Sequence, residues 1–114
     1  MSQILAKAGS VQERIEEMVR RIVSQFNPEK IILFGSHARG EAGPDSDVDL
    51  LVVMAVEGSK RRKATEIDVA LFGINVPVDL IVVRPEELER YRHQIGSIFY
   101  PALRDGKVLY DRAA

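Results

Sequence analysis

Two aspartates separated by one residue, Asp47 and Asp49, are the residues whose types and spacing most clearly suggest chemistry. They fall in residues 47–53, a run that is otherwise aliphatic and typical of a buried strand. Side chains alternate between the two faces of a strand, so both carboxylates project from the same face. Two like charges held that close are costly unless a cation lies between them. The spacing therefore favours a divalent metal site.

A tight turn formed by Gly35 and Ser36 precedes these aspartates and follows an aliphatic strand at residues 31–34. Glycine lets the backbone approach a ligand where a side chain would clash. The turn opens a short predicted helix, Ser36–Arg39, whose first amides can face an anion. Arg39 can bind phosphate through its guanidinium group, or it can equally pair with an acidic residue of the following loop. A metal beside an anion-binding turn indicates a nucleoside triphosphate as ligand.

A third aspartate, Asp79, interrupts another aliphatic run, Val78–Val83. If this strand neighbours residues 47–53, Asp79 completes a cluster of three carboxylates. Such oxygen ligands suit Mg²⁺ or Mn²⁺, which also bind substrate phosphates in sites of this kind. Two ions about 3.5–4 Å apart could then activate an attacking oxygen and stabilise leaving pyrophosphate. Taken singly, each aspartate is often only a strand-end residue that reaches solvent, so the hypothesis depends on their conjunction with the turn. His37 is expected on the helix surface rather than as a ligand.

Composition places the chain among ordinary globular proteins, with 114 residues, 46% hydrophobic and 29% charged. We expect a single domain over residues 1–114, with residues 1–9 as a loose N-terminal segment. A net charge of −1 argues against a nonspecific nucleic-acid binder, so no direct nucleic-acid binding is expected. The absence of cysteine excludes disulfides. We find neither a signal peptide nor an apolar run long enough to span a membrane, and therefore predict a cytoplasmic protein.

Aliphatic strands alternate with amphipathic helices along the chain, which predicts an α/β sandwich whose sheet is covered on at least one face. Besides the short helix, helices are expected at about residues 11–26, 60–72, 85–93 and 96–104, and a last strand at residues 107–110. Whether the first two strands run parallel or antiparallel stays open. Four consecutive cations, residues 60–63, form either a solvated surface run or a basic rim for phosphate or an acidic partner.

The stretch GSHARGEAGPDSDVDLLVV, residues 35–53, resembles the signature of the DNA polymerase beta superfamily of nucleotidyltransferases. That signature is Gly-Ser, ten intervening residues and Asp-x-Asp. The fuller form, with Ala38-Arg39-Gly40 and Ser46, is similar to the minimal (MNT-type) nucleotidyltransferases. VDLIVV around Asp79 resembles the strand that bears their third carboxylate, and the closing GSIFYPALRDGKVLYD resembles their C-terminal ending. The resemblance covers roughly residues 11–112.

This resemblance implies the nucleotidyltransferase fold, a two-layer α+β arrangement in which helices pack against a mixed β-sheet. It also implies transfer of a nucleoside monophosphate, AMP from ATP, onto a hydroxyl group with the help of two Mg²⁺ ions, or of Mn²⁺. Carried over by position, Asp47 and Asp49 would bind both metals. Asp79 would bind the catalytic metal and act as general base.

The nucleotide-binding positions implied by the resemblance are Gly35 and Ser36 for the triphosphate, together with Arg39 and Ser46. Free-standing MNT proteins are commonly paired with a HEPN-domain ribonuclease, which they neutralise as antitoxins by binding and by adenylylation. The implied acceptor is therefore a hydroxyl of a HEPN partner, held on a small open face or against a wall supplied by that partner. Two alternatives stay open: an antitoxin that acts by docking alone, and a transferase that modifies a small molecule.

Overall fold

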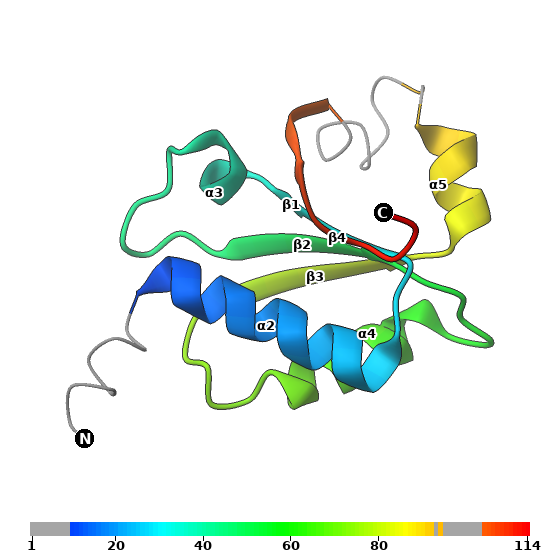
Figure 1. Cartoon of the computed structure of the whole chain (residues 1–114), viewed down its shortest axis with the longest axis horizontal. Coiled ribbons are helices and arrows are strands. Elements are labelled where there is room, and N and C mark those ends of the chain that lie inside the picture. The colour runs from blue at the N-terminus through cyan, green and yellow to red at the C-terminus, as the bar shows by residue number, and fades with distance from the viewer. Residues whose placement is uncertain (1–9, 93, 95–103) are drawn as a thin grey trace.

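The computed structural model describes residues 10–92, 94 and 104–114, and it shows a four-stranded mixed sheet with helices on both faces (Figure 1). In chain order the elements are α2 (Val11–Phe26), β1 (Lys30–Phe34), α3 (Ser36–Arg39), β2 (Val48–Val53), α4 (Lys60–Ala70), β3 (Val78–Val83), α5 (Pro85–Tyr91) and β4 (Lys107–Asp111). These elements confirm the predicted fold class. The helix expected at residues 96–104 lies almost wholly outside the described residues, as does the expected loose segment 1–9.

The strands lie in the order β3-β2-β1-β4. β1 runs antiparallel to both β2 and β4, which settles the direction that the sequence left open. β2 and β3 are parallel, and α4 forms the crossover between them. Parallel neighbours require such a crossover, because a tight turn can only join antiparallel strands. The sheet is therefore mixed, as expected.

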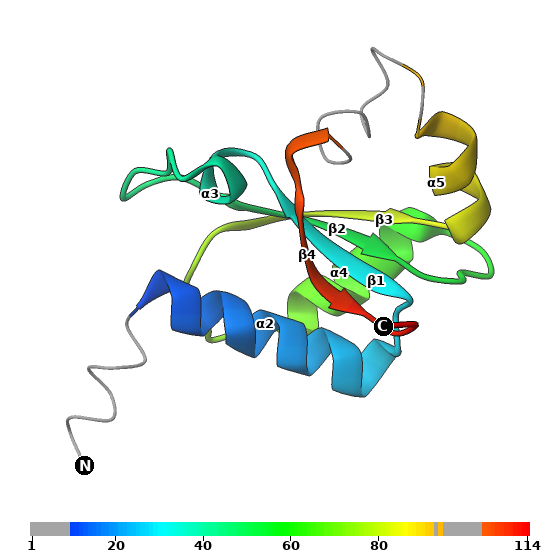
Figure 2. The same ribbon diagram turned by 45° about the horizontal axis from the view of Figure 1, so that its top comes forward.

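One face of the sheet carries the main core, formed with α2 and α4 (Figure 2). α2 contributes Ile15, Met18 and Ile22, at the spacing of one helical face, and α4 contributes Ile67. Both helices begin at a serine cap: Ser10 Oγ accepts from the Glu13 amide at 3.0 Å, and Ser59 caps α4 in the same way. In each helix the serine hydroxyl thus accepts a hydrogen bond from an amide of the first turn, while the apolar face of the helix packs against the sheet.

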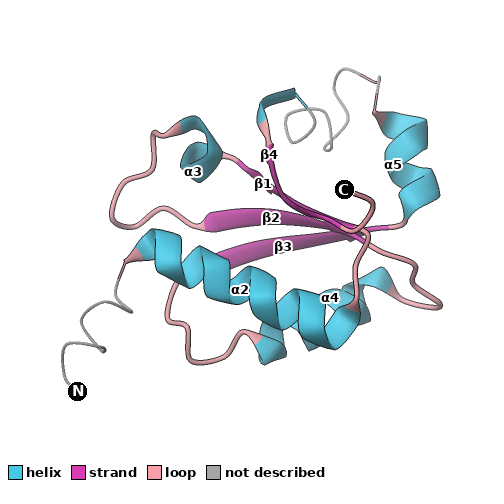
Figure 3. Cartoon of the chain, in the orientation of Figure 1, coloured by secondary structure: helices cyan, strands magenta, loops and turns pink. Residues whose placement is uncertain are grey.

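The opposite face carries a smaller cluster, which consists of Ile32, Leu51, Val53 and Val83 with Leu88 of α5 packed on it. α5 follows the carboxyl end of β3, so it covers only that end of the sheet (Figure 3). The amino-terminal ends of β2 and β3 are not covered by α5. We call this part of the sheet, where Asp49 and Asp79 lie, the open end.

The four cations at residues 60–63 are partly used in internal pairs. Lys60 Nζ donates to Glu87 Oε2 at 2.6 Å, and this bond holds the pKa of the Glu87 carboxyl below its usual value. Lys63 Nζ lies 2.9 Å from a Glu66 carboxylate oxygen and 5.7 Å from the centre of the Phe26 ring. These contacts join α4 to α5 and to the end of α2, so two of the four cations serve the fold. Among the described helices, none is both long and apolar enough to cross a membrane.

Ile67 and Val69 of α4 provide a matched test of this packing. Ile67 is fully buried in the main core, whereas Val69 is 69% exposed. Ile67→Ala should lower the free energy of unfolding by about 2–5 kcal/mol, because it removes buried methyl groups and leaves a cavity. Val69→Ala should change it by less than about 0.5 kcal/mol. Urea unfolding of the two variants checks this, and equal losses would contradict the placement of α4.

Candidate active site

The turn after β1 is the first part of the site. β1 ends at Phe34, Gly35 has a φ of +75°, and α3 begins at Ser36. The amides of Ala38 and Arg39 both donate to the Gly35 carbonyl, at 3.1 and 3.2 Å, which closes the first turn of the helix. No side chain caps this end of α3. The backbone amides at the start of α3 therefore have no side-chain cap, which leaves room for an anion to approach them.

Gly35 also packs directly against Asp49. Phe34 and Asp49 are register partners in the β1–β2 ladder, so the turn after Phe34 comes next to the Asp49 side chain. A Cβ at position 35 would overlap Asp49 Oδ2 and lie 3.0 Å from its Cγ. The glycine is thus required twice, by its positive φ and by the carboxylate beside it.

The three aspartates gather at the open end of the β2–β3 pair. Asp49 and Asp79 are register partners on parallel strands. Asp47 directly precedes β2, which begins at Val48 rather than at Asp47 as predicted. Asp49 is half-buried, while Asp47 and Asp79 are exposed. The strand of Asp79 therefore neighbours that of Asp49, which is the condition on which a three-carboxylate cluster depends.

The electrostatics of this cluster follow from like charges around a partly buried group. Burial raises the pKa of the Asp49 carboxyl above its usual value, and the charges of Asp79 and Asp47 raise it further. His37 and Arg39 act in the opposite direction. A carboxylate in this position gains from any cation that binds between it and its neighbours.

Within the described part of the chain, no three Asp, Glu, His or Cys side chains are gathered closely enough to form a ready-made metal site. The donors nevertheless have the chemistry that Mg²⁺ and Mn²⁺ prefer, since all are carboxylate oxygens. Burial first, and then the charges of Asp79 and Asp47, raise the pKa of the Asp49 carboxyl, so a cation beside it would be stabilising. The three carboxylates therefore have the donor chemistry for a divalent cation, and Asp49 is the partly buried one among them.

Arg39 and Ser46 are placed near this cluster but engage the loop that joins α3 to β2. Arg39 Nε lies 2.9 Å from Glu41 Oε1, so it adopts the acidic pairing that the sequence allows beside phosphate binding. Ser46 Oγ accepts from the Gly43 amide at 2.9 Å. Both contacts organise the loop that leads into Asp47.

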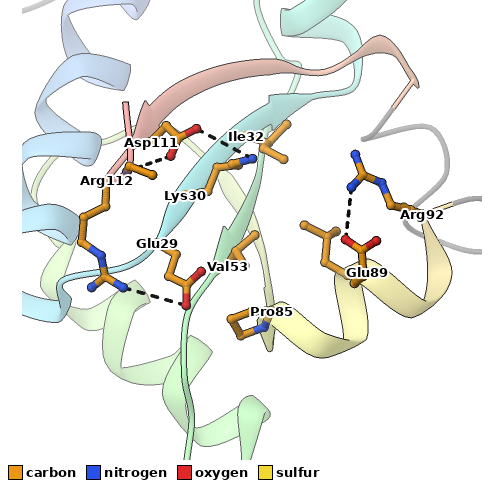
Figure 4. Close-up of a pocket in the computed structure, with 11 residues that line it drawn as sticks. Glu29, Lys30, Ile32, Val53, Pro85, Glu89, Arg92, Asp111 and Arg112 are labelled. Atoms are coloured by element: carbon orange, nitrogen blue, oxygen red, sulfur yellow. Dashed lines mark hydrogen bonds and ion pairs between the residues drawn. The ribbon is translucent and has the colours of Figure 1, made fainter.

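Sequence reasoning did not anticipate a hollow of about 500 Å³ at the other end of the same face, between β1, β4 and α5 (Figure 4). Ile32, Val53 and Leu88 are among its lining residues, and its charged groups pair with one another. The pairs are Lys30–Asp111 and Glu29–Arg112, each at 3.8 Å, and Glu89–Arg92 at 3.1 Å. None of the three aspartates lines it. The hollow has no periodic signal because it is assembled from segments far apart in sequence.

Comparison with known proteins identifies the family. Residues 14–102 match the model of the nucleotidyltransferase domain. The chain belongs to this family. It is 33% identical over 107 residues to a protein of Methanocaldococcus jannaschii named "putative protein adenylyltransferase", covering 86% of this chain and 70% of that protein. The resemblance carried by residues 35–53 is therefore confirmed, and with it the expectation of a nucleotidyltransferase.

Solved structures show the same fold. A crystal structure named as a "putative nucleotidyltransferase" from Sulfolobus solfataricus matches with a TM-score of 0.62 and 23% identity, over 89% of this chain and 80% of that one. A structure of a tri-AMPylated Shewanella oneidensis HEPN toxin in complex with an MNT antitoxin matches with a TM-score of 0.54 and 19% identity. That match covers 90% of this chain and 73% of the other. Both likenesses show that this nucleotidyltransferase shares its fold with these structures.

Gly35 and Gly40 have similar positive φ angles, +75° and +74°, but ψ is −158° at Gly35 and 20°, in the left-handed helical region, at Gly40. Nothing lies within 4 Å of a Cβ at Gly40, whereas one at Gly35 overlaps Asp49. Gly40→Ala should cost about 1 kcal/mol of unfolding free energy from backbone strain alone. Gly35→Ala should cost about 1–3 kcal/mol more, because its φ and ψ lie in a region that only glycine readily adopts and because the Asp49 carboxylate must move. Urea unfolding of both variants measures the difference, and equal losses would refute the contact.

Asp49→Asn tests the electrostatics in metal-free buffer. The folded state holds the Asp49 proton more tightly than the unfolded chain, since folding raises the pKa of this carboxyl above its ordinary value of 3.8. The charged carboxylate therefore destabilises the fold progressively as pH rises from the unfolded pKa through the folded one. Asparagine does not ionise, so its advantage over the wild type should be small at low pH and full at neutral pH. Unfolding curves from about pH 3 to about pH 8 with EDTA check this, and a difference that is constant with pH would be the contrary result.

Proposed function

We propose that this nucleotidyltransferase transfers AMP from ATP to a hydroxyl group of a partner protein, and that it acts as the antitoxin of a HEPN-domain toxin. The observation that carries the proposal is the register of β2 with β3, which sets Asp49 beside Asp79 next to the Gly35 turn. The relative named as a protein adenylyltransferase supports a protein acceptor. The structural neighbour in complex with an AMPylated HEPN toxin supports the class of partner.

Asp47, Asp49 and Asp79 would hold Mg²⁺, in the two-ion arrangement of the superfamily, with Mn²⁺ as a substitute. Bound there, the metal would supply charge neutralisation for the triphosphate and activation of the attacking oxygen. Burial and, after it, the charges of Asp79 and Asp47 raise the pKa of the Asp49 carboxyl, and a bound cation would relieve both costs, which supports this assignment.

Other residues of the protein would bind the triphosphate and hold the loop beside it. The backbone of the turn at Gly35 and the amide and hydroxyl of Ser36 would bind the triphosphate, because the turn approaches without a side chain and its helix end is uncapped. Arg39 would support these phosphates or the loop through Glu41. The motif assigns Ser46 to nucleotide binding, whereas its hydrogen bond to Gly43 favours a role in holding the loop.

The transfer itself is a single displacement at the α-phosphorus. A bond forms between the acceptor oxygen and this phosphorus, and the bond from the phosphorus to the oxygen that bridges to the β-phosphate breaks. Pyrophosphate leaves, and the proton of the acceptor hydroxyl passes to Asp79 as general base. Asp79 is exposed at the open end, so a hydroxyl carried by another protein can reach it.

A second function, an antitoxin that neutralises its partner by docking alone, is favoured by the same neighbour, because that structure is a complex of toxin and antitoxin. The two functions differ in what the aspartates do. Docking requires the surface of the protein, whereas transfer requires its carboxylates.

Asp47→Asn should abolish AMP transfer, lowering the rate by roughly a hundredfold or more, because it removes a charge that neutralises the metal and triphosphate. The assay uses ATP labelled on the α-phosphate, Mg²⁺ and a purified HEPN-domain protein, followed by a gel that shows which protein is labelled. Asp68→Asn is the control, since it makes the same chemical change at an exposed residue of α4. Unchanged labelling by a folded Asp47→Asn variant would overturn the proposal.

The same preparation separates the two functions. The double variant Asp47→Asn/Asp49→Asn should still bind the HEPN partner but lose neutralisation of it if transfer is required. Full neutralisation by this variant, with no label on the partner, would establish the docking function in its place.

A further inference from the structure

A hydrogen bond joins α3 to the end of the loop that carries Asp47. His37 Nε2 lies 3.2 Å from the carbonyl oxygen of Ser46, and both residues are half-buried. A carbonyl can only accept, so the bond requires the proton of the imidazole on Nε2. The His37 side chain is therefore held by a hydrogen bond, although the sequence indicates only a surface position on the helix.

The acceptor of this bond, the Ser46 carbonyl, belongs to a turn that has hydrogen bonds of its own. Ser46 donates its amide to the Gly43 carbonyl at 3.2 Å and accepts the Gly43 amide on its hydroxyl at 2.9 Å. Residues 43–46 thus form a compact turn closed by two hydrogen bonds. His37 attaches this turn to the helix that follows Gly35.

Asp47 is the carboxylate that depends most on such an attachment. The β1–β2 ladder reaches only as far as the pair Phe34–Asp49, and β2 itself begins at Val48. The Val48 amide donates to the Pro77 carbonyl at 2.9 Å, on the β3 side, which fixes the residue after Asp47. On its other side Asp47 follows Ser46, whose carbonyl receives the His37 proton.

We propose that His37 is a positioning residue, which holds Asp47 at a fixed place relative to the Gly35–Ser36 turn by donating its Nε2 proton to Ser46. The inference rests on the proposed function, because it concerns the alignment of the metal-binding and triphosphate-binding halves of that site. A displacement of about 1 Å between reacting groups is enough to slow catalysis by up to about a hundredfold. Nucleotide affinity also depends on the turn and on the carboxylates of Asp49 and Asp79, which the attachment does not hold, and is much less affected.

His37→Gln and His37→Leu form the matched pair for the test, because glutamine keeps a terminal amide donor and leucine has none. His37→Leu should lower kcat for AMP transfer about tenfold, the effect of one lost hydrogen bond on alignment, and should change the Kd for Mg-ATP less than about twofold. His37→Gln should restore kcat to within about threefold of the wild type. Thermal unfolding confirms that both variants are folded.

Three results would each overturn the assignment: a wild-type kcat in His37→Leu, equal losses in the two variants, or a rise in the Kd for Mg-ATP that accounts for the whole loss. The last would mean that His37 acts on nucleotide binding and not on alignment.

The tautomer of the imidazole supplies a readout that needs no activity. Nitrogen–proton correlation spectra of ¹⁵N-labelled protein, with the signal assigned by its loss in His37→Gln, should show the proton of the neutral ring on Nε2. A proton on Nδ1 would refute the bond. If the wild type transfers no AMP to any HEPN acceptor, the proposed function fails, and the tautomer alone then supports or overturns the attachment of the loop.

Discussion

Asp49 and Asp79 lie side by side, in register on adjacent parallel strands, so their carboxylates repel one another whenever the sheet is formed. Partial burial of Asp49 is the larger cost to its charged form, and this repulsion comes on top of it. The arrangement persists because the same strands are held by apolar packing that outweighs it. Leu50 and Val52 of β2 are fully buried in the main core, on the face turned away from the charges. The carboxylates are thus a local source of instability, which the apolar packing of the rest of the fold offsets.

Charge and packing are separated along the strands as well as across the sheet. On the face of the aspartates, the carboxyl-terminal half of β2 supplies Leu51 and Val53 to the small cluster beneath α5. The open end carries the carboxylates and the turn at Gly35 instead. Because α5 covers only one end, the protein buries apolar surface beneath this helix while Asp47 and Asp79 at the other end stay exposed.

Much of this arrangement follows from local pattern. The aliphatic run predicts the strand Val78–Val83 with its observed bounds. The two-residue period of a strand predicts that Asp47 and Asp49 share a face, although β2 begins only at Val48. What pattern cannot supply is pairing. The antiparallel direction of β1 and β2, and the neighbour of the Asp79 strand, depend on contacts between distant segments, which periodicity does not encode.

The same limit applies within the site. The glycine of the Gly-Ser turn is expected to give close approach to a ligand, but its contact with Asp49 follows from strand register. Nothing local marks a partner for His37, because its acceptor is a backbone carbonyl nine residues away in a loop.

Strand order also has a consequence for assembly. The other predicted site residues all lie within the β1–α3–β2 hairpin, whereas Asp79 arrives only through the α4 crossover. Local contacts form early and non-local parallel pairing forms late. We therefore expect the repulsion between the carboxylates to enter the folding reaction only when β3 pairs with β2, in the same step that buries Val82 and Val83.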